Sequence, residues 1–267
     1  MYYNIERDKI FPQQFQIKNK SIIIGRKLHQ NKTVEAKVKE MRAILSGGGG
    51  IAKNPDAYQL FADSVDKRKP VLYIKLASMP EDATESYGRF VVKMAQYGIL
   101  SSRFCRENDM FSEFDLSEFG GIYCDGGNTF RLLKLLKDCG ADKKIVEYLK
   151  NGGVYIGASA GAIIGGADIY PIIYMDPNAV MLDDTTGLDL MKGYSTIAHY
   201  GDASTDNRNN EWYAAVEKLA TRYDKLIALA EENAIVIEDD RIYNIGAPCK
   251  VYENGVARFI GNGENLI

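Results

Sequence analysis

The chain has 267 residues, of which 46% are hydrophobic and 26% charged, and its formal net charge is −3. This composition is typical of a soluble globular protein, and the length suffices for one domain with a full core. The weak negative charge argues against a nucleic-acid surface, which needs basic residues to neutralise phosphates. We also find no apolar run of about 18 residues and no secretory signal pattern at the start, so we expect small partners, no membrane span and a cytoplasmic location.

The four cysteines do not form a recognisable site. Cys105, Cys124, Cys139 and Cys249 are widely spaced and include no C-x-x-C pair. A zinc site or a redox dithiol usually requires such a pair, so we expect reduced thiols in the core and no metal or other cofactor.

The first part of the chain differs from the rest. Residues 1–40 are polar and weakly periodic, whereas apolar runs alternate regularly with amphipathic stretches from Met41 onward. The pattern predicts an appendage of unknown role at residues 1–40, followed by a single α/β domain at residues 41–267.

The first half of this domain alternates strands with helices. Apolar runs predict strands at residues 42–45, 71–76, 99–104 and 121–124, and amphipathic periodicity predicts helices at 55–65, at 84–97 and within 129–150. Strands that alternate with helices favour a largely parallel sheet covered on both faces.

The second half adds the segments of most interest. A strand at residues 153–157 runs directly into a helix, and a strand-like run at 194–199 and a helix near 210–221 follow. Short strands at 225–230, 234–237, 241–245 and 250–253 are separated by turn-forming pairs, which suits a terminal antiparallel meander.

The sequence from Gly157 to Gly161 matches the G-x-S-x-G nucleophile elbow. Small neighbours let the chain turn sharply there and expose the hydroxyl of Ser159. The following helix leaves the N–H of Ala160 free to face a developing oxyanion. The alternative interpretation is a glycine- and alanine-rich turn with an incidental serine.

A serine nucleophile needs a neighbouring base, and the chain has two histidines. His29 lies in the appendage, whereas His199 ends a strand-like run and precedes a polar loop. We therefore favour His199 as the base.

A buried carboxylate usually orients such a histidine. Spacing alone does not choose among the aspartates between Ser159 and His199, which are Asp168, Asp176, Asp183, Asp184 and Asp189. Asp176 begins an Asp-Pro-Asn turn after an apolar run, a place where a sheet edge could present a carboxylate. The same three residues also form an ordinary turn.

A second glycine element, Gly126-Gly127, lies between a buried strand and a helix. Its backbone could bring the N–H of Gly127 opposite Ala160 and complete an oxyanion hole, or it could be a tight turn capped by Asn128 or Thr129. The glycine run at 47–50 lacks the lysine and hydroxyl residue of a phosphate loop, and we interpret it as a flexible loop near the site.

Three segments, Gly126 to Phe130, Gly157 to Ala162 and Ala198 to Tyr200, occur in the order found in the peptidase E family of serine peptidases, also called S51. The chain resembles that family from about Met41 onward. The resemblance implies a flavodoxin-like fold similar to class I glutamine amidotransferases. It also implies Ser159 as nucleophile, His199 as base, and an oxyanion hole at Gly127 and Ala160, and it selects Asp176 as the third residue.

The sequence Gly-Asn-Thr-Phe at residues 127–130 resembles that of dipeptidase E more than that of cyanophycinases. The resemblance therefore implies cleavage of dipeptides with an N-terminal Asp, through an acyl-enzyme. We assign substrate binding to Asn128 and to two candidate cations, Arg131 and Arg208, either of which could instead be a solvated helix charge. The alternatives are a cyanophycinase-like or other small-peptide hydrolase, or a non-catalytic binding domain of the same fold.

Overall fold

The computed structural model describes residues 41–106, 111, 114–201, 214–215 and 217–267. The appendage predicted at residues 1–40 lies outside this range and stays a prediction. The helix predicted near 210–221 lies partly outside it, and residues 214–215 and 217–220, which the structure describes, are helical.

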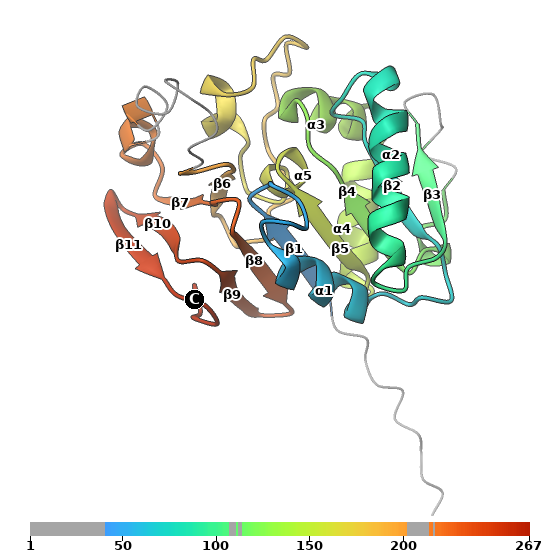
Figure 1. Ribbon diagram of the computed structural model, residues 1–267. Helices are drawn as coiled ribbons and strands as arrows, with labels where there is room; N and C mark the ends of the chain where they lie inside the picture. Colours follow the sequence, from blue (N-terminus) through green and yellow to red (C-terminus); the bar gives the residue numbers. More distant parts are fainter. Residues whose placement is uncertain (1–40, 107–110, 112–113, 202–213, 216) are drawn as a thin grey trace, which may run out of the picture. The chain divides into compact units, whose positions relative to one another are not determined.

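The domain is built on a seven-stranded sheet (Figure 1). Its strands are β1 (Arg42–Ser46), β2 (Val71–Ile74), β3 (Ser102–Cys105), β4 (Gly121–Cys124), β5 (Val154–Ala158), β8 (Asn233–Glu238) and β9 (Arg241–Gly246). They lie in the order β3-β2-β4-β5-β1-β8-β9. The first five are parallel, and β8 and β9 are antiparallel to their neighbours. This mostly parallel, flavodoxin-like α/β sheet confirms the predicted fold class.

Helices cover both faces of this sheet. They are α1 (Pro55–Ser64), α2 (Pro80–Ala95), α3 (Thr129–Asp138), α4 (Ala141–Lys150) and α5 (Ala160–Ile163). Along β1, Ile44 packs in the core beneath α1 and α2, whereas Leu45 packs in the core beneath α3, α4 and α5. Both faces of the central strands are therefore buried, which is why these strands read as continuous apolar runs.

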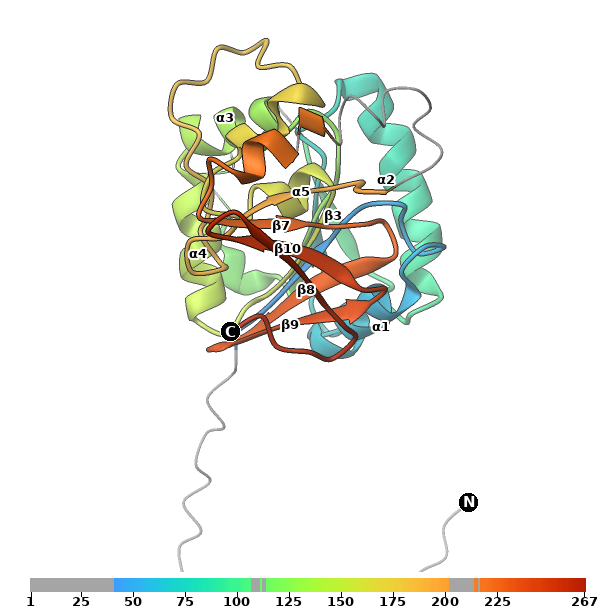
Figure 2. The same cartoon turned by 90° about the vertical axis from the view of Figure 1, so that its left-hand side faces the viewer.

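A second, four-stranded sheet lies beside β8 and β9 (Figure 2). It contains β6 (Ser195–Ile197), β7 (Lys225–Ala228), β10 (Cys249–Glu253) and β11 (Val256–Ile260), in the order β11-β10-β7-β6. The sequence did not indicate β11 as a strand. β6 and β7 are parallel, and Ile197 pairs with Ala228 at their ends.

This arrangement corrects the predicted terminal meander. The hairpin of β8 and β9 joins the large sheet instead, and β7 pairs with β10. The physical reason lies in β8, where Ala234 to Ile237 form an unbroken buried apolar run. Such a strand needs cover on both faces, which β1 and its helices provide.

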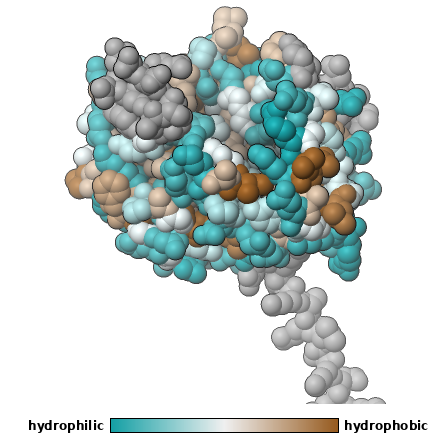
Figure 3. All heavy atoms as spheres, in the orientation of Figure 1, coloured by the Kyte–Doolittle hydropathy of each residue, from teal (hydrophilic) through white to brown (hydrophobic). Residues whose placement is uncertain are grey.

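The face drawn in Figure 3 is mostly hydrophilic, with hydrophobic residues in separate places. Among the described residues, no helix has the length and apolar character needed to cross a membrane. All four cysteines are free thiols, and only Cys139 is not fully buried.

Candidate active site

Ser159 occupies a sharp turn between β5 and α5. Its φ of 54° and ψ of −115° are unusual for a residue with a side chain, as a nucleophile elbow requires. The turn depends on close packing, because a Cβ on Gly161 would overlap the carbonyl oxygen of Cys124. The result is a half-buried serine hydroxyl at the carboxyl edge of the parallel strands.

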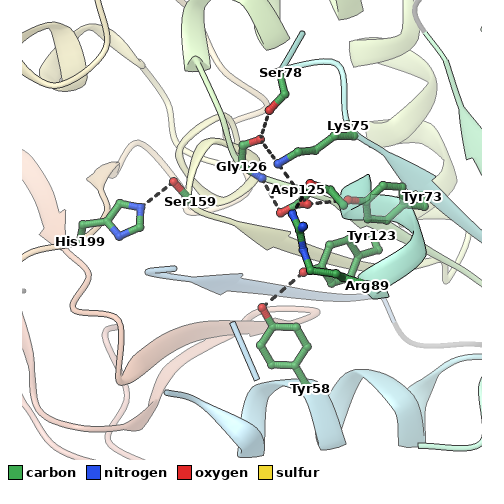
Figure 4. Close-up of polar contacts among 11 residues, drawn as sticks. Tyr58, Tyr73, Lys75, Ser78, Arg89, Tyr123, Asp125, Gly126, Ser159 and His199 are labelled. Carbon is green, nitrogen blue, oxygen red and sulfur yellow. Dashed lines mark hydrogen bonds and ion pairs between the residues drawn. The ribbon is translucent and has the colours of Figure 1, made fainter. Parts of the chain in front are cut away.

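His199 reaches this hydroxyl from the end of β6. Its Nε2 lies 2.8 Å from Ser159 Oγ, as Figure 4 shows. Its backbone N–H donates to the carbonyl of Gly47 at 3.0 Å. The ring packs against Gly48, where a Cβ would overlap it and where φ is +122°. The glycine run at 47–50 therefore lies at the site, where it makes room for the imidazole.

Glu231 lies on the other side of the imidazole. Its Oε1 is 2.6 Å from His199 Nδ1, and the residue is only 9% exposed. Because β6 and β7 are parallel and paired to their ends, His199 and Glu231 leave the same end of the small sheet. A carboxylate at Nδ1 favours the tautomer with the proton on that nitrogen, which leaves Nε2 free to accept the serine proton.

The sequence analysis expected Asp176 in this place, and the structure puts Glu231 there instead. Asp176 Oδ2 accepts hydrogen bonds from the backbone N–H of Thr129 at 2.7 Å and from Thr129 Oγ1 at 2.6 Å. It thereby caps the start of α3. Burial raises the pKa of Asp176, while the two bonds from Thr129 and the nearby His199 act in the opposite direction.

The other aspartates between Ser159 and His199 either contact other groups or are exposed. Asp168 accepts from Tyr223 Oη, Asp184 pairs with Lys137, Asp189 accepts from the N–H of Gly193, and Asp183 is exposed. The sequence analysis missed Glu231 because it considered only carboxylates that precede the histidine.

The predicted oxyanion hole consists of two backbone N–H groups, those of Gly127 and Ala160. Ala160 is the first residue of α5, so its N–H has no acceptor within the helix. The N–H of Gly127 has no acceptor in the described part of the chain. The neighbouring Gly126 packs against the serine, since a Cβ on it would lie 3.4 Å from Ser159 Oγ. An oxyanion hole formed by these two N–H groups stays a prediction.

The three residues expected to bind substrate differ in what can be said of them. Asn128 uses its Oδ1 to cap α3 by accepting from the N–H of Arg131, and its Nδ2 donates to the carbonyl of Pro177. Arg131 lies in the first turn of α3, directly after the glycine turn. Arg208 lies outside the described residues. Their roles in binding stay predictions.

Most of this chain is similar in sequence to known proteins. A sequence model described as "Peptidase family S51" matches residues 26–245. The chain belongs to peptidase family S51. This confirms the resemblance seen in the sequence, and the matched S51 region contains Ser159, His199 and Glu231.

Individual relatives of this chain share between about a quarter and a third of its residues in the matched regions. An uncharacterised peptidase of Listeria monocytogenes is 33% identical over 60% of this chain and 66% of its own length, and one of Pasteurella multocida is 32% identical over 65% and 83%. A "Peptidase E" of Salmonella newport is 26% identical over 72% of this chain and 82% of its own length. For the Listeria monocytogenes relative, and for an uncharacterised peptidase of Listeria innocua that is 35% identical over 45% of this chain, the match spans less than two thirds of the relative's length.

Solved structures show the same S51-type fold. A structure titled as a putative peptidase E protein from Listeria monocytogenes superposes with a TM-score of 0.61 at 27% identity, over 78% of this chain and 98% of the other. A peptidase from an acI-B1 actinobacterium gives a TM-score of 0.66 at 19% identity, over 86% and 98%, and this second likeness concerns the fold alone.

Proposed function

We propose that this S51 family member is a serine hydrolase of small peptides, in which Ser159, His199 and Glu231 act together. The observation that carries the proposal is the continuous chain of hydrogen bonds from Ser159 Oγ through the imidazole of His199 to the carboxylate of Glu231. Each group in this chain supports the chemical role of the next.

The first half-reaction forms an acyl-enzyme. Ser159 Oγ attacks the peptide carbonyl carbon while His199 Nε2 takes the hydroxyl proton, and Glu231 stabilises the resulting imidazolium. The carbonyl oxygen becomes an oxyanion that accepts hydrogen bonds from the N–H groups of Gly127 and Ala160. The carbon–nitrogen bond then breaks, and His199 delivers its proton to the leaving amine.

The second half-reaction releases the acid. His199 takes a proton from water, the hydroxide attacks the ester carbonyl, and the same two N–H groups hold the second oxyanion. The bond to Ser159 Oγ breaks, and the proton returns from His199 to the serine. No metal or cofactor takes part in this sequence of steps.

For the substrate, we propose dipeptides with an N-terminal Asp. This finer statement rests on the Gly126 to Phe130 segment, which resembles dipeptidase E, and on relatives that carry the name "Peptidase E". A buried substrate carboxylate requires a cation or several N–H donors, and Arg131 and Arg208 are the candidates that we retain. The alternative is a cyanophycinase-like or other peptide hydrolase with the same three residues.

Two measurements test the proposal. A fluorophosphonate probe should label the wild-type protein and not Ser159→Ala, and equal labelling of both would remove the serine from the mechanism. The kcat/KM for Asp-Leu should exceed those for Asn-Leu, Glu-Leu and Ala-Leu by about tenfold or more, because an unpaired cation costs binding energy in the transition state. A flat profile would leave the hydrolase and remove the aspartyl preference.

A second candidate is a non-catalytic binding domain of this fold. Labelling that is absent from the wild-type protein, together with no turnover of any dipeptide, would favour this candidate.

A further inference from the structure

A compact charged cluster lies behind the glycine turn, on the side away from Ser159 and His199 in Figure 4. Lys75 Nζ donates to the carbonyl oxygen of Gly126 at 2.8 Å and lies 3.2 Å from Asp125 Oδ2. Asp125 also accepts from Tyr73 Oη at 2.6 Å and from the N–H of Gly126 at 2.7 Å. The reaction steps above use none of these side chains.

The two charged side chains of the cluster are largely shielded from solvent. The side chain of Lys75 is 11% exposed and that of Asp125 is 23% exposed. A cation so far from water is costly unless an anion and hydrogen-bond acceptors receive it, and Asp125 and the Gly126 carbonyl fill those roles. Tyr73 and the Gly126 N–H in turn hold the Asp125 carboxylate in one orientation.

The carbonyl that Lys75 holds belongs to the same peptide unit as the N–H of Gly127. No cis peptide bond occurs in the described residues, and in a planar trans peptide the C=O and the following N–H point in opposite directions. A lysine that fixes the carbonyl on one side therefore also fixes the direction of the N–H on the other. Gly126 separates Lys75 from Ser159, since a Cβ on Gly126 would lie 3.0 Å from Ser159 Cβ.

We propose that Lys75, oriented by Asp125, is a positioning residue that holds the Gly126–Gly127 peptide so that the Gly127 N–H faces the oxyanion. The inference rests on the proposed function, because it assigns a support to the oxyanion hole of that reaction. A charged donor suits this task, since a charge-assisted hydrogen bond is stronger than a neutral one and resists rotation of the peptide. Glycine itself offers little steric resistance to such rotation, and the other donor to this carbonyl, Ser78 Oγ, is neutral and more distant, at 3.5 Å.

The test compares Lys75→Met with wild type by the rate of fluorophosphonate labelling and by kcat and KM for the best dipeptide of the panel. Removal of one oxyanion donor costs about 10²–10³ in kcat, so a donor that is present but misaligned should cost about 10–100-fold, with KM changed less than about threefold. Lys75→Arg should recover part of the loss.

A matched control is Lys69→Met, at the opposite end of β2. Lys69 Nζ also donates to a backbone carbonyl, that of Ser117 at 2.6 Å, and this bond lies away from the glycine turn. The control should label and turn over at the wild-type rate.

The double variant Lys75→Met with Asp125→Asn separates positioning from charge balance. It leaves no unpaired buried charge, so it also serves if Lys75→Met alone does not fold. We expect the double variant to remain as slow as the single one, because the Gly126 carbonyl then keeps only the long, neutral contact from Ser78 Oγ at 3.5 Å. Recovery of the wild-type rate would mean that Lys75 only neutralises Asp125, and would overturn the inference.

Two further results would also overturn it. One is an unchanged labelling rate in Lys75→Met while wild type is active, which would leave the proposed function intact. The other is an effect confined to KM for acidic first residues, which would make Lys75 a substrate-binding cation. A wild-type protein that neither takes the probe nor cleaves any dipeptide would instead remove the proposed function, and this inference with it.

Discussion

Two carboxylates approach the same histidine from different parts of the chain. Glu231 follows β7 in the small sheet, whereas Asp176 follows the short 3₁₀ helix Tyr170–Tyr174 (η3) that comes after the nucleophile elbow. Glu231 contacts His199 Nδ1 directly, while Asp176 gives its acceptor capacity to Thr129. Both are shielded from water, so burial alone does not distinguish their roles.

The difference lies in what each carboxylate does for its partner. In the proposed reaction, Glu231 orients the imidazole of His199 while that ring gains and loses a proton, so we expect its benefit in turnover. Asp176 satisfies backbone and side-chain donors at the start of α3, and its benefit therefore appears in the folded state. The comparison predicts that substitutions at Glu231 mainly lower turnover and that substitutions at Asp176 mainly lower stability.

The largest loss of kcat should come from replacing Ser159 or His199. Ser159→Ala and His199→Ala should each lower kcat by about 10⁴ or more, and the double variant should be little worse than either single one, because the two act as a unit. Steady-state kinetics on the best dipeptide would measure this. Additive losses would mean that the two residues do not share a step.

The next largest effect is the difference in kcat between variants of the two carboxylates. Glu231→Gln should lower kcat by about 10³–10⁴, because the amide no longer stabilises the imidazolium. Asp176→Asn should change kcat by less than about tenfold. Kinetics of the two variants side by side provide the measurement, and the reverse order would restore Asp176 as the residue that orients His199.

The sequence predicted the local feature of the site, the turn at Ser159, but not the contact between His199 and Glu231, which depends on strand pairing. The nucleophile elbow is local, so five residues around Ser159 predicted both the strand-to-helix turn and its place in the parallel sheet. The contact between His199 and Glu231 depends on β6 and β7 being parallel neighbours, and no spacing in the sequence states this pairing. The four terminal strands occur where they were predicted, but their arrangement as one meander was wrong, because pairing with β1 in the large sheet decided where β8 lies.

A signal for Glu231 was nevertheless present. The predicted strand at 225–230 runs directly into Glu231, and a strand that ends in an acidic residue is the counterpart of one that ends in His199. Carboxylates at strand ends on both sides of the histidine deserve equal consideration, because chain order in such sites varies between folds.

A smaller effect concerns the stability provided by the Asp176 region. Asp176→Ala should leave the Asn128 cap of α3 in place but lower the free energy of unfolding by about 1–2 kcal/mol, because the buried donors of Thr129 lose their acceptor. Denaturant or thermal unfolding would measure the loss. Glu231→Gln serves as the control, with its melting temperature expected closer to that of wild type.

The smallest effect should be the pH dependence of that stability. Burial raises the folded-state pKa of Asp176 above its ordinary value of 3.8, so the folded protein binds this proton more tightly than the unfolded chain. The stabilisation that the protonated Asp176 carboxyl provides is therefore fully present below the pKa of the unfolded chain, and it is lost as the pH rises through the pKa of the folded protein.

In Asp176→Asn the amide oxygen can still accept from Thr129, but the side chain does not titrate. The stability of Asp176→Asn relative to wild type should therefore increase as pH rises from about 4 toward neutrality and then level off. Unfolding in denaturant at a series of pH values would show this, and a difference that instead decreased with pH would mean that the bonds from Thr129 outweigh burial at this carboxylate.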